Sequence, residues 1–232
     1  MRWRQRLIDN VLPLHCQLCL QCVDTHPAIC DPCATDLPWL KFACEICGLA
    51  LPASAIQTCG ACQATLPNLQ KTTVLFEYLS PINRLITDLK FKQQLGLARL
   101  FGQILADRLQ QQPPSARPLA IVPVPLHRAR LAERGFNQST ELARPLARAW
   151  GVPILNDVVA RARATPAQSG LSAKARVRNV KGAFRVSKTN LPARVLILDD
   201  VVTTGATVNE LAGILHKGGV STIEVAAIAR SS

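Results

Sequence analysis

Short apolar runs and longer amphipathic stretches alternate along the chain from residue 72 onward. Apolar runs rich in Val, Ile and Leu are typical of buried strands, and they occupy residues 72–79, 119–126, 154–161, 195–198 and 222–229. Between them, apolar residues recur at helical spacing, which predicts helices near residues 82–89, 97–105, 139–150 and 207–217. Strands that alternate with helices indicate an α/β fold, with a parallel or mostly parallel sheet flanked by helices.

All nine cysteines lie before this pattern, between Cys16 and Cys62. Eight of them form Cys-x-x-Cys pairs, with ten residues between the first two pairs and eleven between the last two. Such a turn points two thiolates at one metal, and two turns complete the tetrahedral sulfur shell that suits zinc. We therefore expect one or two structural Zn²⁺ ions, bound by Cys16, Cys19, Cys30, Cys33, Cys44, Cys47, Cys59 and Cys62.

Disulfides, a redox-active pair and an iron–sulfur cluster are the alternatives for these thiols, and a repeated array of four pairs favours zinc over each of them. Pairs adjacent in sequence would form two successive ribbons, whereas interleaved pairs would form one cross-braced module. The near-equal spacing and Gly48 favour successive ribbons. Cys22 and His26 could act as substitute ligands, but we interpret both as bystanders.

The cysteine-rich segment and the α/β pattern divide the chain into two expected domains. Residues 1–66 would form an N-terminal helix and a double zinc-ribbon module, and residues 67–232 the larger domain. The first helix has one apolar face, which indicates packing, with a membrane or nucleic acid contact as the alternative. No run reaches the roughly 20 apolar residues that span a bilayer, and the start does not resemble a targeting signal. We expect a cytoplasmic protein.

The charge balance favours anionic partners. Lys and Arg number 27 against 15 Asp and Glu, which gives a formal net charge of +12. Nucleotides, phosphoribosyl compounds and nucleic acid all suit such a chain, and a merely soluble basic protein is the plain alternative. The 48% of hydrophobic residues excludes a disordered chain.

The stretch VLILDDVVTTGATVNE, residues 195–210, carries the clearest sign of chemistry. Its aliphatic start predicts a buried strand, so Asp199 and Asp200 follow at the carboxyl end, where ligands bind in parallel sheets. The turn into the next helix contains Thr203, Thr204, Gly205, Ala206 and Thr207. Helix N-termini bind phosphate, and paired carboxylates can accept hydrogen bonds from vicinal hydroxyls. A ribose 5-phosphate combines both groups.

VLILDDVVTTGAT resembles the phosphoribosyl pyrophosphate signature of type I phosphoribosyltransferases, in which four aliphatic residues precede two acids, a spacer and Thr-Gly-x-Thr. VPVPLHRARLAERGFNQS, residues 122–139, and RARATPAQSGLSAKARVRNVKGAF, residues 161–184, resemble the corresponding segments of ComF-type proteins. With the double Cys-x-x-Cys module, the chain is similar to the ComF/GntX family and looks most like its GntX branch. The resemblance implies a type I phosphoribosyltransferase-like fold and a link to competence, DNA uptake and use of DNA as a nutrient.

The resemblance also implies roles for individual residues. Asp199 and Asp200 would be catalytic and hold the ribose hydroxyls, directly or through Mg²⁺, while the threonine-rich turn would bind the 5-phosphate. Arginines clustered after a strand end are expected at the pyrophosphate: Arg128, Arg130 and Arg134. A basic loop would close over the substrate as a lid, with contacts from Arg163, Lys174 and Arg176.

Two functions stay open at this point. The protein could be a phosphoribosyltransferase acting on a base or another nitrogen nucleophile that the sequence does not identify. Alternatively, it could be a non-catalytic sensor of phosphoribosyl pyrophosphate or a nucleotide, whose ribbons and basic surface bind single-stranded DNA or a DNA-uptake protein. Both hypotheses require a phosphoribosyl ligand at the acidic pair.

Overall fold

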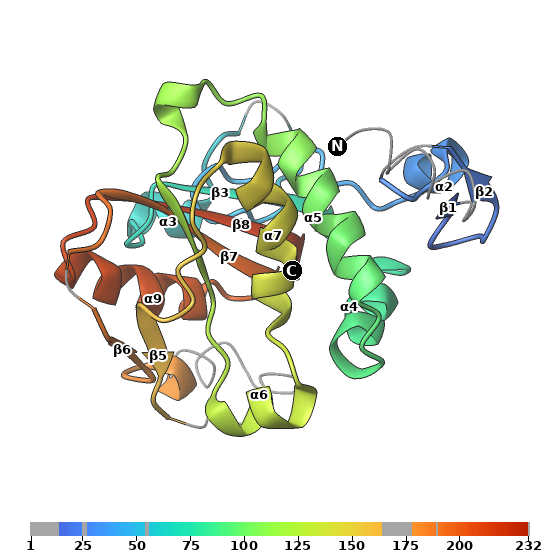
Figure 1. Ribbon diagram of the computed structural model, residues 1–232. Helices are drawn as coiled ribbons and strands as arrows, with labels where there is room; N and C mark the ends of the chain where they lie inside the picture. The colour runs from blue at the N-terminus through green and yellow to red at the C-terminus, as the bar shows by residue number, and fades with distance from the viewer. Residues whose placement is uncertain (1–13, 25–26, 54–55, 164–177, 189, 232) are drawn as a thin grey trace.

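Strands and helices alternate through the larger part of the chain. The computed structural model describes residues 14–24, 27–53, 56–163, 178–188 and 190–231. Four strands form one parallel sheet in the order β3-β8-β7-β4 (Figure 1). Their bounds are Lys71–Glu77 for β3, Ala120–Pro123 for β4, Arg194–Val202 for β7 and Thr222–Arg230 for β8. The predicted α/β class and parallel sheet are confirmed.

Helices cover both faces of the sheet, and each face has its own apolar core. Alternate residues of a strand point to opposite faces, so Leu196 and Leu198 join one core while Val195 and Ile197 join the other. The first core contains residues of three helices: α4 (Ile82–Phe91), α5 (Leu95–Leu109) and α7 (Gln138–Trp150). The second contains residues of α9 (Ala206–Lys217).

Strand β7 is longer than the sequence predicts. It continues past residue 198 to Val202, because Asp199, Val201 and Val202 keep their pairing with β8. The acidic pair therefore lies within the last four residues of the paired strand β7 and not beyond its end. This pairing fixes the backbone of both acids.

The strand expected over residues 154–161 is also different. Polar Asn156 and Asp157 interrupt the apolar run, and only Val159–Arg161 forms a strand, β5. It pairs antiparallel with β6 (Phe184–Val186) in a separate two-stranded sheet. Ile154 makes a single bridge to Ile121 of β4.

The outer edge of β3 is covered by the chain that joins the two halves of the cysteine-rich segment. Three backbone hydrogen bonds connect them: Leu40 N to Leu75 O at 2.9 Å, Glu77 N to Pro38 O at 2.9 Å and Thr72 N to Glu45 O at 2.8 Å. The Trp39 ring packs on Phe76 with centroids 4.5 Å apart. The second half of the cysteine-rich segment is thus attached directly to the sheet.

The small elements lie mostly in the cysteine-rich segment. Strands β1 (Leu14–His15) and β2 (Cys22–Val23) pair antiparallel with each other, and helix α2 (Asp31–Thr35) lies beside them. This part stands apart from the sheet in Figure 1. Helix α3 (Gly60–Ala64) follows in the second half; the 3-10 turn η1 (Pro114–Ala116) and helix α6 (Arg128–Arg134) flank β4. The predicted N-terminal helix falls outside the described residues. Within those residues, no helix combines the length and apolarity needed to cross a bilayer.

Candidate functional site

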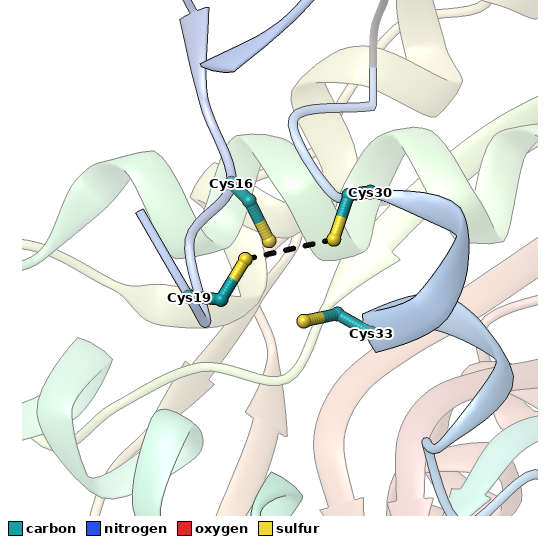
Figure 2. Close-up of side chains that lie close together, drawn as sticks. All are labelled: Cys16, Cys19, Cys30 and Cys33. Carbon is teal, nitrogen blue, oxygen red and sulfur yellow. Dashed lines mark hydrogen bonds between the residues drawn. The ribbon is translucent and has the colours of Figure 1, made fainter. Parts of the chain in front are cut away.

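The paired cysteines form two separate clusters. The first cysteine group contains Cys16, Cys19, Cys30 and Cys33, and the second contains Cys44, Cys47, Cys59 and Cys62. In each group the sulfur atoms lie within 4.8 Å of one another, and Figure 2 shows the first group converging on one point. Pairs adjacent in sequence share a site, so successive ribbons are confirmed and interleaving is not found.

The spacing of the sulfur atoms fits zinc. Sulfur atoms of Cys19 and Cys30 are 3.6 Å apart, as are those of Cys47 and Cys59. A Zn–S bond of about 2.3 Å places tetrahedral sulfur ligands about 3.8 Å apart. All nine cysteines are free thiols, which excludes the disulfide alternative. Cys22 lies outside both groups, with its sulfur 3.8 Å from His15 Nε2, and His26 falls outside the described residues.

Each group is assembled from a tight turn followed by a helix start. Cys30 and Cys59 are the N-cap residues of α2 and α3, so Cys33 and Cys62 lie on the first turns of those helices. This local geometry brings each later pair of thiols together without long-range contacts. It explains why the ligand spacing in the sequence predicts the pairing.

The thiols of one group oppose each other's ionisation. Burial disfavours the Cys16 thiolate, but backbone N–H groups of Cys19 and Cys30 outweigh it and lower the pKa of Cys16 to about 6. In the same group, the neighbouring Cys30 sulfur and burial raise the pKa of Cys33. The first thiolate thus forms readily and the last does not. A divalent cation removes this conflict, since thiolates are the metal ligands.

The acidic pair is buried at the carboxyl end of β7. Asp199 and Asp200 expose only 9% and 4% of their surfaces. Asp199 Oδ1 accepts hydrogen bonds from Ser139 Oγ at 3.3 Å and from the Asp200 N–H at 2.9 Å. Asp200 Oδ1 accepts from Gln138 Nε2 at 3.4 Å, and its Oδ2 forms an ion pair with Lys90 of α4. Helices α4 and α7 therefore orient both carboxylates.

The two carboxylates have opposite pKa shifts. Burial, followed by the charge of Asp200, raises the pKa of Asp199 to about 8. Burial also opposes ionisation of Asp200, but the Lys90 ammonium outweighs it and lowers the pKa of Asp200. In return, Asp200 offsets the burial of Lys90 and raises its pKa. At neutral pH the pair thus shares about one negative charge, which Lys90 balances.

The threonine-rich turn connects β7 to α9. Gly205 is the N-cap with φ of 75°, a conformation that favours glycine, and α9 begins at Ala206, one residue before its predicted start. Thr203, Gly205, Ala206 and Thr207 line a cavity with the acidic pair. Thr204 is exposed, and its hydroxyl accepts a hydrogen bond from Ala206 N at 3.4 Å.

The cavity has a volume of about 430 Å³ and combines acids, cations and the helix start. Arg130, Arg134 and Arg161 line it together with Lys90. Arg134 donates to Gln138 Oε1 at 2.5 Å, and its guanidinium lies 5.4 Å from the centroid of the Phe91 ring. The cations outnumber the acids, so the cavity suits a ligand with several negative charges.

Some predicted site residues do not reach this cavity. Arg128 lines a neighbouring cavity between α6, α7 and β5. Arg163 donates instead to the carbonyl oxygens of Asn179 and Lys181, both at 2.9 Å. Lys174 and Arg176 fall outside the described residues. The arginine cluster is therefore divided between two cavities, because only Arg130 and Arg134 lie on the side of α6 that faces the acids.

Sequence reasoning missed two cations of the site. Lys90 lies on the buried face of α4, one turn after Ile86. A lysine on this otherwise apolar face was the sequence signal that could have identified it as a site residue. Arg161 ends β5, and its guanidinium lies 5.5 Å from the Phe184 ring on the paired strand. Nothing in the local sequence distinguishes Arg161 from its basic neighbours.

Known proteins match nearly the whole chain. Residues 7–63 match the double zinc ribbon domain family. "Competence protein F" of Haemophilus influenzae is 38% identical over 212 residues, which cover 88% of this chain and 90% of that protein. The chain belongs to the ComF/GntX family. "DNA utilization protein YhgH" of Escherichia coli K12 is 35% identical over 209 residues, which cover 89% of this chain and 92% of that protein. "Competence protein ComFC" of Streptococcus pneumoniae is 26% identical over 156 residues, which cover 67% of this chain and 66% of that protein.

This ComF/GntX member thus combines two regions of different chemistry. The double zinc ribbon match and two four-cysteine groups identify structural Zn²⁺ sites in residues 16–62. The parallel sheet supplies a second site, where acids, cations and a helix N-terminus meet around one cavity.

Proposed function

We propose that the cavity binds phosphoribosyl pyrophosphate with Mg²⁺, and that the protein transfers the phosphoribosyl group to a nitrogen nucleophile. One observation carries the proposal: a buried acidic pair lies beside a helix N-terminus, in a cavity that four cationic side chains also line. Neither the acids alone nor the loop alone would select this ligand. Together they suit a sugar diol flanked by phosphates.

The 5-phosphate binds at residues 203–207, which we name the phosphate loop. Backbone N–H groups at the start of α9 and the hydroxyls of Thr203 and Thr207, which line the cavity, would donate hydrogen bonds to the phosphate. Gly205 leaves open space, because no heavy atom lies within 4 Å of its Cβ position. The pyrophosphate lies toward Arg130, Arg134 and Arg161, whose guanidinium groups match phosphate oxygens. Arg128 and Arg163 are not part of this subsite.

The acids bind the ribose hydroxyls. For Asp200 to do so, Lys90 must give up its ion pair, and the released ammonium then faces the ligand's phosphates. Asp199 and Asp200 present the oxygen ligands that Mg²⁺ prefers, and a bound ion would neutralise charge on the departing pyrophosphate. In the transfer itself, pyrophosphate leaves the anomeric carbon with the bonding electron pair. The lone pair of the acceptor nitrogen forms the new bond, and that nitrogen releases its proton to water. The cations stabilise the charge of the leaving group.

A second candidate function is a non-catalytic sensor or adaptor that binds a phosphoribosyl compound or nucleotide and also contacts single-stranded DNA or an uptake protein. It is supported by relatives named for competence and DNA utilization, and by the net charge of +12. Under either function we propose a cytoplasmic location, where reduced thiols can retain zinc. We also propose residues 1–66 and 67–232 as the two domains, although contacts across this boundary are extensive.

Calorimetric titration of the zinc-loaded chain with phosphoribosyl pyrophosphate, with and without Mg²⁺, tests the proposal. Binding should weaken by at least about tenfold in Asp200→Asn, since a charge-assisted hydrogen bond is lost. Asp107→Asn, at an exposed position of α5, is the matched control and should bind as the wild type does. Lack of Mg²⁺-dependent binding to the wild type would refute the proposal.

Turnover separates the two candidate functions. Pyrophosphate release is measured with a panel of nucleobases, and release that Asp200→Asn abolishes supports phosphoribosyl transfer. Binding without release, together with salt-sensitive retention of single-stranded DNA, supports the sensor or adaptor.

A further inference from the structure

A buried arginine lies between the second cysteine group and the phosphate loop. Arg230 is the last residue of β8 and is only 7% exposed. Its Nη1 donates hydrogen bonds to Val202 O at 3.2 Å and to Ser231 O at 3.0 Å. The same guanidinium interacts with Cys47 and lies within electrostatic reach of Cys59 and Cys44. One side chain thus hydrogen-bonds the residue that precedes the phosphate loop and interacts electrostatically with the second cysteine group.

Without metal, the second cysteine group does not fully compensate the charge of the buried Arg230 guanidinium. Burying a guanidinium is costly unless charges and hydrogen bonds compensate it. Within the described part of the chain, Arg230 Nε has no hydrogen-bond partner. Four thiolates around one Zn²⁺ carry a net negative charge, and N–H groups that face such sulfurs commonly orient the ligands. The metal-loaded second cysteine group therefore supplies the missing counter-charge.

The loop side of the contact is equally direct. Val202 ends β7, and the next residue begins the phosphate loop. Its carbonyl oxygen accepts from Arg230 and also from Ser231 N at 3.0 Å. These two hydrogen bonds fix the point at which the strand turns toward the ligand.

We propose that Arg230 is a positioning residue that couples zinc at the second cysteine group to the shape of the phosphate loop. With zinc bound, Arg230 is held in place and keeps the Val202 carbonyl fixed; without zinc, the guanidinium loses its counter-charge and the loop loosens. The naming of the loop as a phosphate site rests on the proposed function. Because coupling is reciprocal, phosphoribosyl pyrophosphate should in turn slow loss of zinc from the second group.

The first cysteine group provides the internal control. It adjoins the start of α5, where the side chain of Gln17 lies 3.5 Å from the Cβ position of Gly96. It also includes the exposed Cys19. Loss of its zinc should leave the phosphate loop unchanged.

Hydrogen exchange of the peptide spanning residues 202–208, in the zinc-loaded full chain without ligand, is the primary test. Arg230→Met should keep two zinc ions per chain, but exchange in this peptide should accelerate about tenfold, a typical coupling between sites. Arg194→Met is the matched control, since Arg194 donates to the Ser115 carbonyl from the opposite end of β7. It should leave the exchange unchanged. Equal exchange in Arg230→Met and the wild type would overturn the proposal.

A second pair of variants tests the metal itself. Cys47→Ser and Cys19→Ser should each lower the zinc content by one ion, and only Cys47→Ser should accelerate exchange in residues 202–208. Equal effects of the two would contradict the coupling, and Arg230→Met decides the matter if Cys47→Ser does not fold. Arg230→Met should also bind phosphoribosyl pyrophosphate about tenfold more weakly than Arg230→Lys, which retains a donor. If the wild type does not bind this ligand, the proposed function fails while the exchange result stands.

Discussion

The second cysteine group and the acidic pair both bury several groups that repel each other when ionised. The two sites differ in the source of the positive charge that offsets this repulsion. At the acidic pair, the chain supplies its own counter-ion, Lys90. At the second cysteine group, the cation found among the described residues is Arg230, which interacts with Cys47, Cys59 and Cys44. A site with a built-in counter-ion can exchange it for a ligand, whereas a site without enough positive charge depends on its metal permanently. This difference distinguishes the proposed ligand site from the structural metal site.

The largest expected loss of stability tests whether the second cysteine group depends on its metal. Cys59→Ser should lower the free energy of unfolding by about 4 kcal/mol, as loss of a structural metal does, because the group continues into the core of the sheet. Cys33→Ser in the first group should cost the larger domain less than about 1 kcal/mol, since that ribbon can open locally. Urea unfolding with zinc analysis measures both. Equal losses of stability in Cys59→Ser and Cys33→Ser would show that the two cysteine groups contribute equally to the stability of the larger domain.

Removing the built-in counter-ion should have the next largest effect. Lys90→Met leaves Asp200 buried without its partner and should cost about 2 kcal/mol at pH 7, below the full cost of breaking a buried pair because the Lys90 side chain is 23% exposed. The folded pKa of Asp200 is lowered by Lys90, so this stability is present above the unfolded pKa and lost as pH falls. The loss should therefore shrink in acid.

Lys92→Met is the control for that variant. Lys92 forms an ion pair with Asp88 one turn away on the same helix, but its side chain is 61% exposed, and such pairs contribute less than about 0.5 kcal/mol. If both lysine variants unfold at the same urea concentration, Lys90 is not a significant counter-ion.

The raised pKa of Asp199 predicts a pH effect of opposite sign. Its folded pKa of about 8 exceeds the model-compound value of 3.8, so the stability it contributes is complete below the lower value and is lost as pH rises toward the upper one. Asp199→Asn should remove this dependence and gain stability relative to the wild type between pH 4 and 8. Because a single proton is involved, the free energy of unfolding changes by at most about 1.4 kcal/mol per pH unit. Parallel urea curves at several pH values, with Asp107→Asn as control, measure it; identical slopes would contradict the assignment.

The smallest expected effect concerns how each ribbon is attached. Buried Thr72 donates to Ile46 O at 2.6 Å, so Thr72→Val leaves that carbonyl unsatisfied and should cost about 1 kcal/mol. Thr35 makes the equivalent bond to Asp31 O at 2.9 Å on an exposed helix, and Thr35→Val should be nearly neutral. Thermal unfolding compares them. A neutral Thr72→Val would show that the hydroxyl does not attach the ribbon to the sheet.

Features set by local geometry could be predicted from the sequence. Cysteine spacing predicts the grouping because each pair sits on a turn or helix start, and VLILDDVVTTGAT predicts a strand, a glycine-dependent turn and a helix. Features set by long-range pairing could not. Asp200 meets Lys90 across more than a hundred residues of chain, and the extension of β7 depends on the register of β8. The division of the arginines between two cavities depends on which side of α6 each occupies.

The hydrogen bonds along β3 have a consequence for the fate of newly made protein. β3 is the edge of a four-stranded sheet, and the segment that protects it lies between two metal sites. A chain that acquires no zinc would leave this strand free to pair with a copy of itself. Scarcity of the metal should therefore first appear as self-association, and supply of zinc during synthesis would set how much of the protein stays dispersed.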